Sequence, residues 1–284
     1  MGLKIIKIPR YFSLKEQHVK AFVRVLDKLY HTKQNEVRID FAAVEESSKG
    51  DMMVLFAQLE KIKETKNTNF SFSNTRVAEK KIDGDIYSLK KRLSKGEGAN
   101  PRLNPSFVSV IANNLRKIGI NKNREDHVPY CERVEALLTE ILGNAIEHGI
   151  RKRKINFWFT IEVNRQKEEV VFVFADMGEG IARSHREAGL PLSYKFSGDS
   201  RIVINSLNGK LPSSTKEPNR GKGLPEVKKI IKDELVSNFE LITNKVAINY
   251  SDKQFKRKKI PNFVGTYYSW TVTKDNLERW KNTP

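Results

Sequence analysis

Residues Val134–Gly180 decide the fold, and they read VEALLTEILGNAIEHGIRKRKINFWFTIEVNRQKEEVVFVFADMGEG. The first part predicts a helix, because its apolar residues recur at helical spacing. Pro129 near the start and Gly149 just past the expected end match the preferences of helix termini for proline and glycine. The stripe that should face a core consists of Val134, Leu137, Leu138, Ile141, Leu142 and Ala145.

Three polar side chains share one edge of this helix. Glu140 and Asn144 are four residues apart and lie on one face, and Glu147 follows on nearly the same side. Taken alone, such an edge is usually the solvated side of a helix, because short motifs match often by chance. The segments that follow favour a binding site instead.

Those segments carry two further motifs. The β-branched and aromatic runs 155–163 and 169–175 flank the polar turn NRQKE and predict a β-hairpin. The second run ends in DMGEG at 176–180, where a carboxylate can accept from an exocyclic amine and two glycines allow close backbone approach. Further on, NRGKGLPEV at 219–227 places a glycine pair at a helix start, where free N–H groups favour an anion.

The order E-x-x-x-N, then D-x-G-x-G, then G-x-G-L at a helix start resembles the three ATP-binding boxes of the GHKL superfamily. That superfamily includes DNA gyrase, heat-shock chaperones, histidine kinases and MutL. The chain is most similar to the anti-sigma-factor serine kinases, whose first box also reads N-A-x-E-H, as residues 144–148 do. The resemblance covers about residues 105 to 275. It implies a Bergerat-type α/β sandwich with a mixed, mostly antiparallel sheet, and ATP and Mg²⁺ as ligands.

The resemblance also implies roles for individual residues. Glu140 would be the general base, Asn144 would coordinate the Mg²⁺ that bridges the phosphates, and Asp176 would accept from the adenine amino group. These residue types suit the chemistry, because Mg²⁺ prefers oxygen ligands and phosphoryl transfer depends mainly on positioning and charge neutralisation. The implied nucleotide contacts are Asn144, Asp176, Gly178, Gly180, Gly221, Lys222, Gly223 and Leu224.

Two features depart from the common pattern. Leu224 is followed by Pro225 where histidine kinases have another glycine, so we expect a rigid helix start and a tighter lid. The expected lid, residues 181–220, is long and rich in Gly, Pro, Ser and Asn, which is typical of functional or mobile loops. Within the lid, Asp199–Leu207 is predicted to form a short helix.

Composition bounds the class of protein. Of the 284 residues, 38% are hydrophobic and 30% charged, which is typical of a globular protein with one or two domains. No apolar run approaches the length of a membrane span, and the start lacks a signal peptide's apolar region, so no membrane association is expected. The one cysteine, Cys131, excludes an internal disulfide and suits a reducing cytoplasm, where we expect the protein to be located.

The charge balance is strongly basic. Fifty-two basic and 34 acidic residues give a formal net charge of +18, which favours polyanions. The basic runs lie at 90–92, 151–154 and 256–259, and we place the third in a loop before the last strand. Both a solvated surface and a nucleic-acid patch fit these runs. The solvated surface fits better, because neither interleaved aromatic residues nor a recognition helix accompanies them.

Residues 1–75 predict a second, separate domain. Strands and helices alternate there, which indicates a small α/β unit with helices packed on a sheet. The turn EESSKGD at 45–51, just before a helix, resembles part of the STAS domain of anti-sigma-factor antagonists. In that family a GHKL kinase phosphorylates a serine at this turn, so the resemblance implies Ser47 and Ser48 as phosphoacceptors. The alternative is a serine that acts simply as an N-cap. The expected strands are 3–8, 36–41 and 68–72, and the expected helices are 14–30 and 52–62.

The remaining segments complete the expected order. Residues 76–104 mix Lys-rich patches with glycine and proline and predict a connector, and residues 105–284 form the expected ATP-binding domain. Its first helix is expected at 107–118. Its last strands are expected at 239–243, 246–250 and 265–272.

Two functions fit the sequence. The first is an Mg²⁺-dependent ATPase switch or serine kinase that uses Glu140 as its general base. The second is a nucleotide-gated module that binds a protein or a nucleic acid without turnover and tolerates loss of Glu140. Intact Glu140 and Asn144 favour the enzyme. A protein partner is expected in either case, and a homodimer fits the resemblance although no sequence feature requires it.

Overall fold

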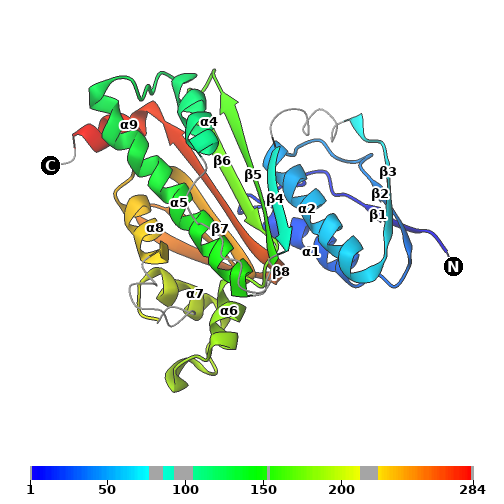
Figure 1. The fold of residues 1–284 in the computed structure, drawn as a ribbon. Coiled ribbons are helices and arrows are strands. Elements are labelled where there is room, and N and C mark those ends of the chain that lie inside the picture. The colour runs from blue at the N-terminus through cyan, green and yellow to red at the C-terminus, as the bar shows by residue number, and fades with distance from the viewer. Residues whose placement is uncertain (1, 77–85, 93–104, 152–153, 212–222, 283–284) are drawn as a thin grey trace.

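The chain folds around two β-sheets that lie side by side (Figure 1). The computed structural model describes residues 2–76, 86–92, 105–151, 154–211 and 223–282. In this part of the chain the smaller sheet is parallel with the order β1-β2-β3, and the larger has the order β4-β5-β6-β8-β7. Every described pair in the larger sheet is antiparallel. The predicted α/β class is therefore confirmed.

The N-terminal unit alternates strand and helix as predicted. Its two crossovers join neighbouring parallel strands, so with the usual right-handed connection both helices lie on the same face of the small sheet. The elements are β1 (Lys4–Lys7), α1 (Val19–Tyr30), β2 (Glu36–Asp40), α2 (Lys49–Lys66) and β3 (Asn69–Ser73).

The larger sheet contains the predicted hairpin and one strand that was not expected. Residues 86–92 form β4 at its edge, so the segment predicted as a connector is in part a strand. The basic run 256–259 lies inside β8, not in a loop. Strands β7 and β8 form a long hairpin, and this run pairs with residues 246–249 of β7. The strands are β4 (Ile86–Arg92), β5 (Lys154–Asn164), β6 (Glu169–Asp176), β7 (Ser237–Ser251) and β8 (Gln254–Thr273).

Helices cover one face of the larger sheet. The long helix α5 runs across it, and it continues to Arg151, past the end predicted at Gly149. Among the described residues, no helix combines the length and the apolar character needed to cross a membrane. The helices are α4 (Pro105–Arg116), α5 (Val128–Arg151), α6 (Ile181–Ala188), α7 (Asp199–Leu207), α8 (Gly223–Lys232) and α9 (Lys274–Lys281), with short 3-10 turns at η1 (Glu125–His127) and η2 (Leu192–Tyr194).

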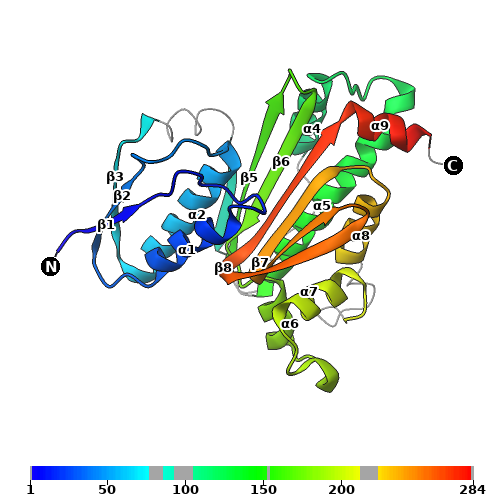
Figure 2. The ribbon, with the colours of Figure 1, turned by 180° about the vertical axis from the view of Figure 1, so that it is seen from behind.

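The N-terminal unit packs against the other face of the same sheet. Figure 2 shows α1 and α2 between the two sheets. One hydrophobic cluster contains residues of these helices, such as Phe22 and Leu55, and residues of the larger sheet. The latter include Val173 of β6, Phe263 of β8 and Met177 in the turn after β6. The N-terminal unit, predicted as a second domain, therefore shares a hydrophobic core with the larger sheet.

Helix α2 is attached to the larger sheet near its start and at its middle. Near its start, the Gly50 N–H donates to Glu162 Oε1 at 2.8 Å, and a Cβ added to Gly50 would lie 2.6 Å from Val173 Cγ2. Two turns later, Gln58 Nε2 donates to the Val264 carbonyl at 2.8 Å. Only glycine allows the first approach, and the two partly buried hydrogen bonds hold the helix on the sheet.

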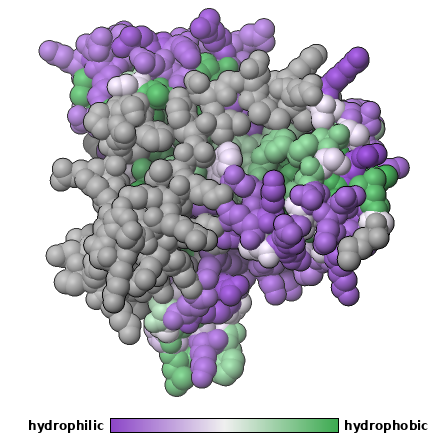
Figure 3. Space-filling model, turned by 45° about the vertical axis from the view of Figure 1, so that its right-hand side comes forward, coloured by the Kyte–Doolittle hydropathy of each residue, from purple (hydrophilic) through white to green (hydrophobic). Residues whose placement is uncertain are grey.

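The predicted lid region is largely helical where it is described. Helix α7 has the predicted bounds, and α6 precedes it. The segment between them projects from the molecule (Figure 1), and apolar side chains appear at the lower tip of the surface in Figure 3. Leu192 and Phe196 in this segment are 83% and 94% exposed. Residues 212–220 lie outside the described residues.

Candidate functional site

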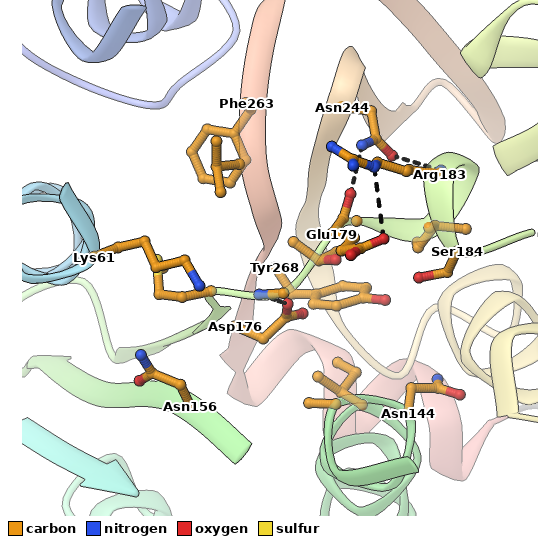
Figure 4. A pocket seen from close by; sticks show the side chains of 18 of the residues that line it. Lys61, Asn144, Asn156, Asp176, Glu179, Arg183, Ser184, Asn244, Phe263 and Tyr268 are labelled. Carbon is orange, nitrogen blue, oxygen red and sulfur yellow. Dashed lines mark hydrogen bonds and ion pairs between the residues drawn. The ribbon is translucent and has the colours of Figure 1, made fainter. Parts of the chain in front are cut away.

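A cavity of about 390 Å³ lies beside the C-terminal half of α5 (Figure 4). Helices α2, α5, α6 and α8, strands β5, β7 and β8, and the turn after β6 all contribute to its walls. A cavity of this size is within the range of small-ligand sites, and its lining mixes apolar surface with a few convergent polar groups. The first two of the three predicted boxes contribute Asn144 and Asp176 to those polar groups.

The first and third boxes meet where α8 begins. A Cβ added to Gly223 would lie 3.0 Å from Asn144 Oδ1 and 3.0 Å from Glu140 Oε2. The N-terminus of α8 therefore faces the polar pair of α5 without any side chain between them. Buried Asn144 Nδ2 has no hydrogen-bond partner among the described residues. A buried amide without a partner is rare, which indicates that a ligand or water completes this site.

Glu140 lies in a partly buried position beside another carboxylate. Burial raises its pKa, and the negative charge of Glu226 on α8 raises it further. Arg133 on α5 pairs with Glu226 at 2.9 Å, which holds the start of α8 on α5. A carboxylate whose pKa is raised in this way is a stronger base than an exposed one.

Asp176 lies at the end of β6, in the wall of the cavity. Burial raises its pKa to about 6, while hydrogen bonds from Gly178 and Thr266 and the charge of Lys61 oppose the rise. The Gly178 N–H donates to Asp176 Oδ1 at 2.8 Å. Neighbouring Gly265 has φ +89°, and a Cβ there would lie 1.9 Å from the Asp176 carbonyl oxygen, so glycine is required beside this strand end.

The second glycine of the turn lines the cavity and also has a role in the fold. Gly180 has φ +79°, and a Cβ added to it would lie 2.6 Å from Thr243 Oγ1 and 2.7 Å from the Asn244 amide. These two β7 residues cap α6: Thr243 Oγ1 accepts from Ile181 N–H, and Asn244 Oδ1 accepts from Ala182 N–H, both at 2.9 Å. The turn is thereby fixed to β7.

The structure brings most predicted site residues together. Asn144, Asp176, Gly178, Gly180 and Leu224 all line the cavity. Glu140 and Gly223 lie close to Asn144 at the edge of the cavity. Gly221 and Lys222 lie outside the described residues.

Ser47 and Ser48 lie apart from this cavity, at the start of α2. Ser48 is the N-cap of α2: its Oγ accepts from the Asp51 N–H at 3.0 Å, and Asp51 Oδ2 accepts from the Ser48 N–H at 2.9 Å. Ser47 is buried, at 4% exposure. The N-cap interpretation is confirmed. The phosphoacceptor role stays a prediction, and at Ser48 it would break the hydrogen bonds between the hydroxyl and Asp51.

Sequence reasoning gave no role to most polar residues of the cavity, because they lie outside the three motifs. Four of them come from four different elements: Lys61 on α2, Asn156 on β5, Asn244 on β7 and Thr266 on β8. Of these four, only Asn156 and Thr266 carried a signal, because each lies on a strand next to a predicted site element. Arg183, Ser184 and Glu187 of α6 and Asn262 of β8 line the cavity as well.

The donor set suits a cation that takes most of its ligands from elsewhere. The described residues contain no group of three or more His, Cys, Asp or Glu that could hold a metal ion. Asn144 Oδ1 and Glu140 Oε2 nonetheless converge beside Gly223. Mg²⁺ commonly keeps several waters and takes one or two protein oxygens plus phosphate oxygens, so these residues fit it.

The third basic run is divided between two faces of the sheet. Lys258 pairs with Ala247, and Lys256 pairs with Asn249, in the antiparallel register of β7 and β8. Because side chains alternate along a strand, Arg257 and Lys259 point to the opposite face. The run therefore offers no single four-residue basic patch.

Comparison of the chain with protein-family models, with curated proteins and with solved structures gave no match.

Proposed function

We propose that the chain binds ATP with Mg²⁺ in this cavity and uses it as a GHKL-type ATPase switch or serine kinase. One observation carries the proposal: motifs far apart in the sequence converge on one cavity. Asp176 lines it, and Glu140 and Asn144 meet the start of α8 at its edge. A sheet with helices on one face supports the sandwich that the resemblance implies, although every described strand pair is antiparallel and the expected sheet was mixed.

The polar groups divide the cavity into two ends. Asp176 provides a half-buried acceptor for an exocyclic amine, which suits the base of the nucleotide. The α8 N-terminus and Asn144 provide N–H groups and an oxygen ligand, which suit phosphates and their metal ion. When bound, Mg²⁺ would neutralise phosphate charge, and Asn144 would hold it.

Glu140 is the base in this proposal. Its carboxylate lies next to the proposed phosphate end, and it can orient a water molecule or a serine hydroxyl for attack on the terminal phosphate. The proton of that nucleophile passes to Glu140, and the bond between the terminal phosphate and the leaving diphosphate breaks. An ATPase and a serine kinase differ here only in the acceptor.

We expect Glu140→Gln to retain ATP binding and to lose turnover by at least about a hundredfold, the usual contribution of a general base. The matched control is Glu132→Gln, an exposed residue on the same helix. The assay incubates the protein with Mg²⁺ and γ-labelled ATP and measures free phosphate and protein-bound label together. Free phosphate indicates an ATPase, and label on the protein indicates a kinase.

Undiminished turnover by Glu140→Gln would exclude Glu140 as the base. ATP binding without either product would favour the second candidate, a nucleotide-gated module that binds a protein or a nucleic acid. The net charge of +18 supports a polyanion as its partner, and binding to nucleic acid should then weaken steeply as salt rises.

A further inference from the structure

We propose that Lys61, which belongs to the N-terminal unit, recognises the base of the nucleotide. Its ammonium group donates a hydrogen bond to a ring nitrogen of adenine. That nitrogen lies beside the exocyclic amine, which donates to Asp176. This inference rests on the proposed ATP binding and adds that the N-terminal unit supplies part of the site. None of the three boxes contains Lys61, and its sequence position is far from all of them.

Helix α2 holds Lys61 in the cavity. Gln58 lies one turn earlier on the same side of the helix, is fully buried and donates to the Val264 carbonyl at 2.8 Å. Tyr30 of α1 donates to Gln58 Oε1 at 2.7 Å, so the amide is held at both ends. Val264 itself lines the cavity. Lys61 therefore projects from a fixed helix and not from a loop.

Lys61 lies at the end of the cavity that suits the base. Figure 4 shows its side chain extending from α2 toward Asp176, while Asn144 lies on the opposite side of Asp176. Burial raises the pKa of Asp176, and the positive charge of Lys61 is a smaller influence that lowers it. A lysine that contacts phosphates would be expected beside Asn144 and Gly223 instead.

A second unexplained amide lies on the same side. Asn156 of β5 lines the cavity, and both its Nδ2 and Oδ1 are buried without a hydrogen-bond partner among the described residues. Figure 4 shows it on the Lys61 side of Asp176. Leaving both atoms unpaired is costly, so water or the polar edge of a ligand is expected at this wall.

The chemistry of purines decides which base fits. In adenine the exocyclic amine lies between two ring acceptors, N1 and N7, so a donor next to Asp176 meets one of them. In guanine a carbonyl oxygen occupies the position of that amine and would face the Asp176 carboxylate. The pair of Asp176 as acceptor and Lys61 as donor therefore selects adenine.

The test compares ligands with and without phosphates. Isothermal titration of adenosine and of ATP with Mg²⁺ is made on the full chain, on Lys61→Met and on the control Lys63→Met, an exposed residue of the same helix. We expect Lys61→Met to weaken both ligands by about tenfold, the effect of losing a charged hydrogen bond, and the control to weaken neither. Wild-type protein should also bind either 1-deaza-adenosine or 7-deaza-adenosine about tenfold less tightly than adenosine, and Lys61→Met should remove that difference.

Three results would overturn the inference. Unchanged affinities in Lys61→Met would show that the lysine contacts no ligand, and weaker ATP with unchanged adenosine would place it on the phosphates. Tighter binding of guanosine than of adenosine by the wild type would exclude the base assignment. Failure of the folded wild type to bind any nucleotide would instead overturn the proposed function, and the inference with it. Circular dichroism of each variant checks that α2 stays folded.

Discussion

At the scale of single residues, we expect the titration of Asp176 to make the affinity of the site for adenosine depend on pH. Burial raises its pKa to about 6, and the ionised form is the better acceptor for the adenine amine. Adenosine affinity should therefore be highest above that pKa and fall by about tenfold between about pH 7.5 and about pH 5. Adenosine is the ligand of choice, because it has no phosphate that titrates in this window.

The control for this prediction is Asp176→Asn, which cannot ionise. Its adenosine affinity should be low and constant over the same window. A wild-type affinity that does not change with pH would show that the carboxylate is not the acceptor, whatever the affinity is.

Residue-level reasoning identified the polar pair Glu140 and Asn144 and the carboxylate Asp176, because each belongs to a motif with fixed spacing. It did not anticipate that Gly180, which lines the cavity, also allows the capping of α6 by Thr243 and Asn244 through its positive φ and its lack of a side chain. Lys61 was missed, because only the tertiary packing of α2 brings it to the cavity.

At the scale of elements, the start of α2 depends on its capping box. Ser48 and Asp51 exchange hydrogen bonds there, and Asp51 Oδ1 also accepts from the Leu14 N–H at 2.7 Å. Ser48→Ala should lower the free energy of unfolding by about 1 kcal/mol, as for other N-cap serines. Urea denaturation measures this, with Ser71→Ala on the exposed part of β3 as the matched control.

Equal stability of Ser48→Ala and the wild type would contradict the importance of the cap. It would also remove the main structural objection to Ser48 as a phosphoacceptor, because the hydroxyl could then leave Asp51 without cost. A loss in the expected range would mean that phosphorylation at Ser48 must first break a stabilising interaction.

Elements were predictable where the pattern was local. The α5 stripe, the β5–β6 hairpin and α7 follow from apolar periodicity and turn residues. Strand β4 and the first half of β8 were not predicted, because both carry charged residues that resemble a solvated loop. Strand β4 is stabilised by pairing with β5, and the first half of β8 by pairing with β7. Amino-acid composition does not reveal these pairings.

At the scale of the whole molecule, two runs carried a signal that was not used. VVFVFA at 170–175 is apolar without alternation, and MMVLFA at 52–57 is apolar around the whole helix. A strand and a helix of this kind are covered on both faces. In the structure β6 is packed between α5 and the N-terminal unit, and α2 is packed between the two sheets. The shared core could have been predicted from these runs.

This shared core has a consequence for function. Under the proposal, nucleotide binding would contact both parts of the chain, Asp176 on one and Lys61 on the other. Any partner that moves the N-terminal unit would then change nucleotide affinity, and by reciprocity nucleotide would change the affinity for that partner.

The most direct measurement is a calorimetric titration of ATP with Mg²⁺ into the wild type and into Asp176→Asn. We predict one site per chain in the wild type and at least about a tenfold loss of affinity in the variant. The variant should stay folded at neutral pH, because the raised pKa of Asp176 means that the charged carboxylate costs the folded state stability there, and asparagine carries no charge. Equal affinities, or no ATP binding by the folded wild type, would contradict the proposed nucleotide site.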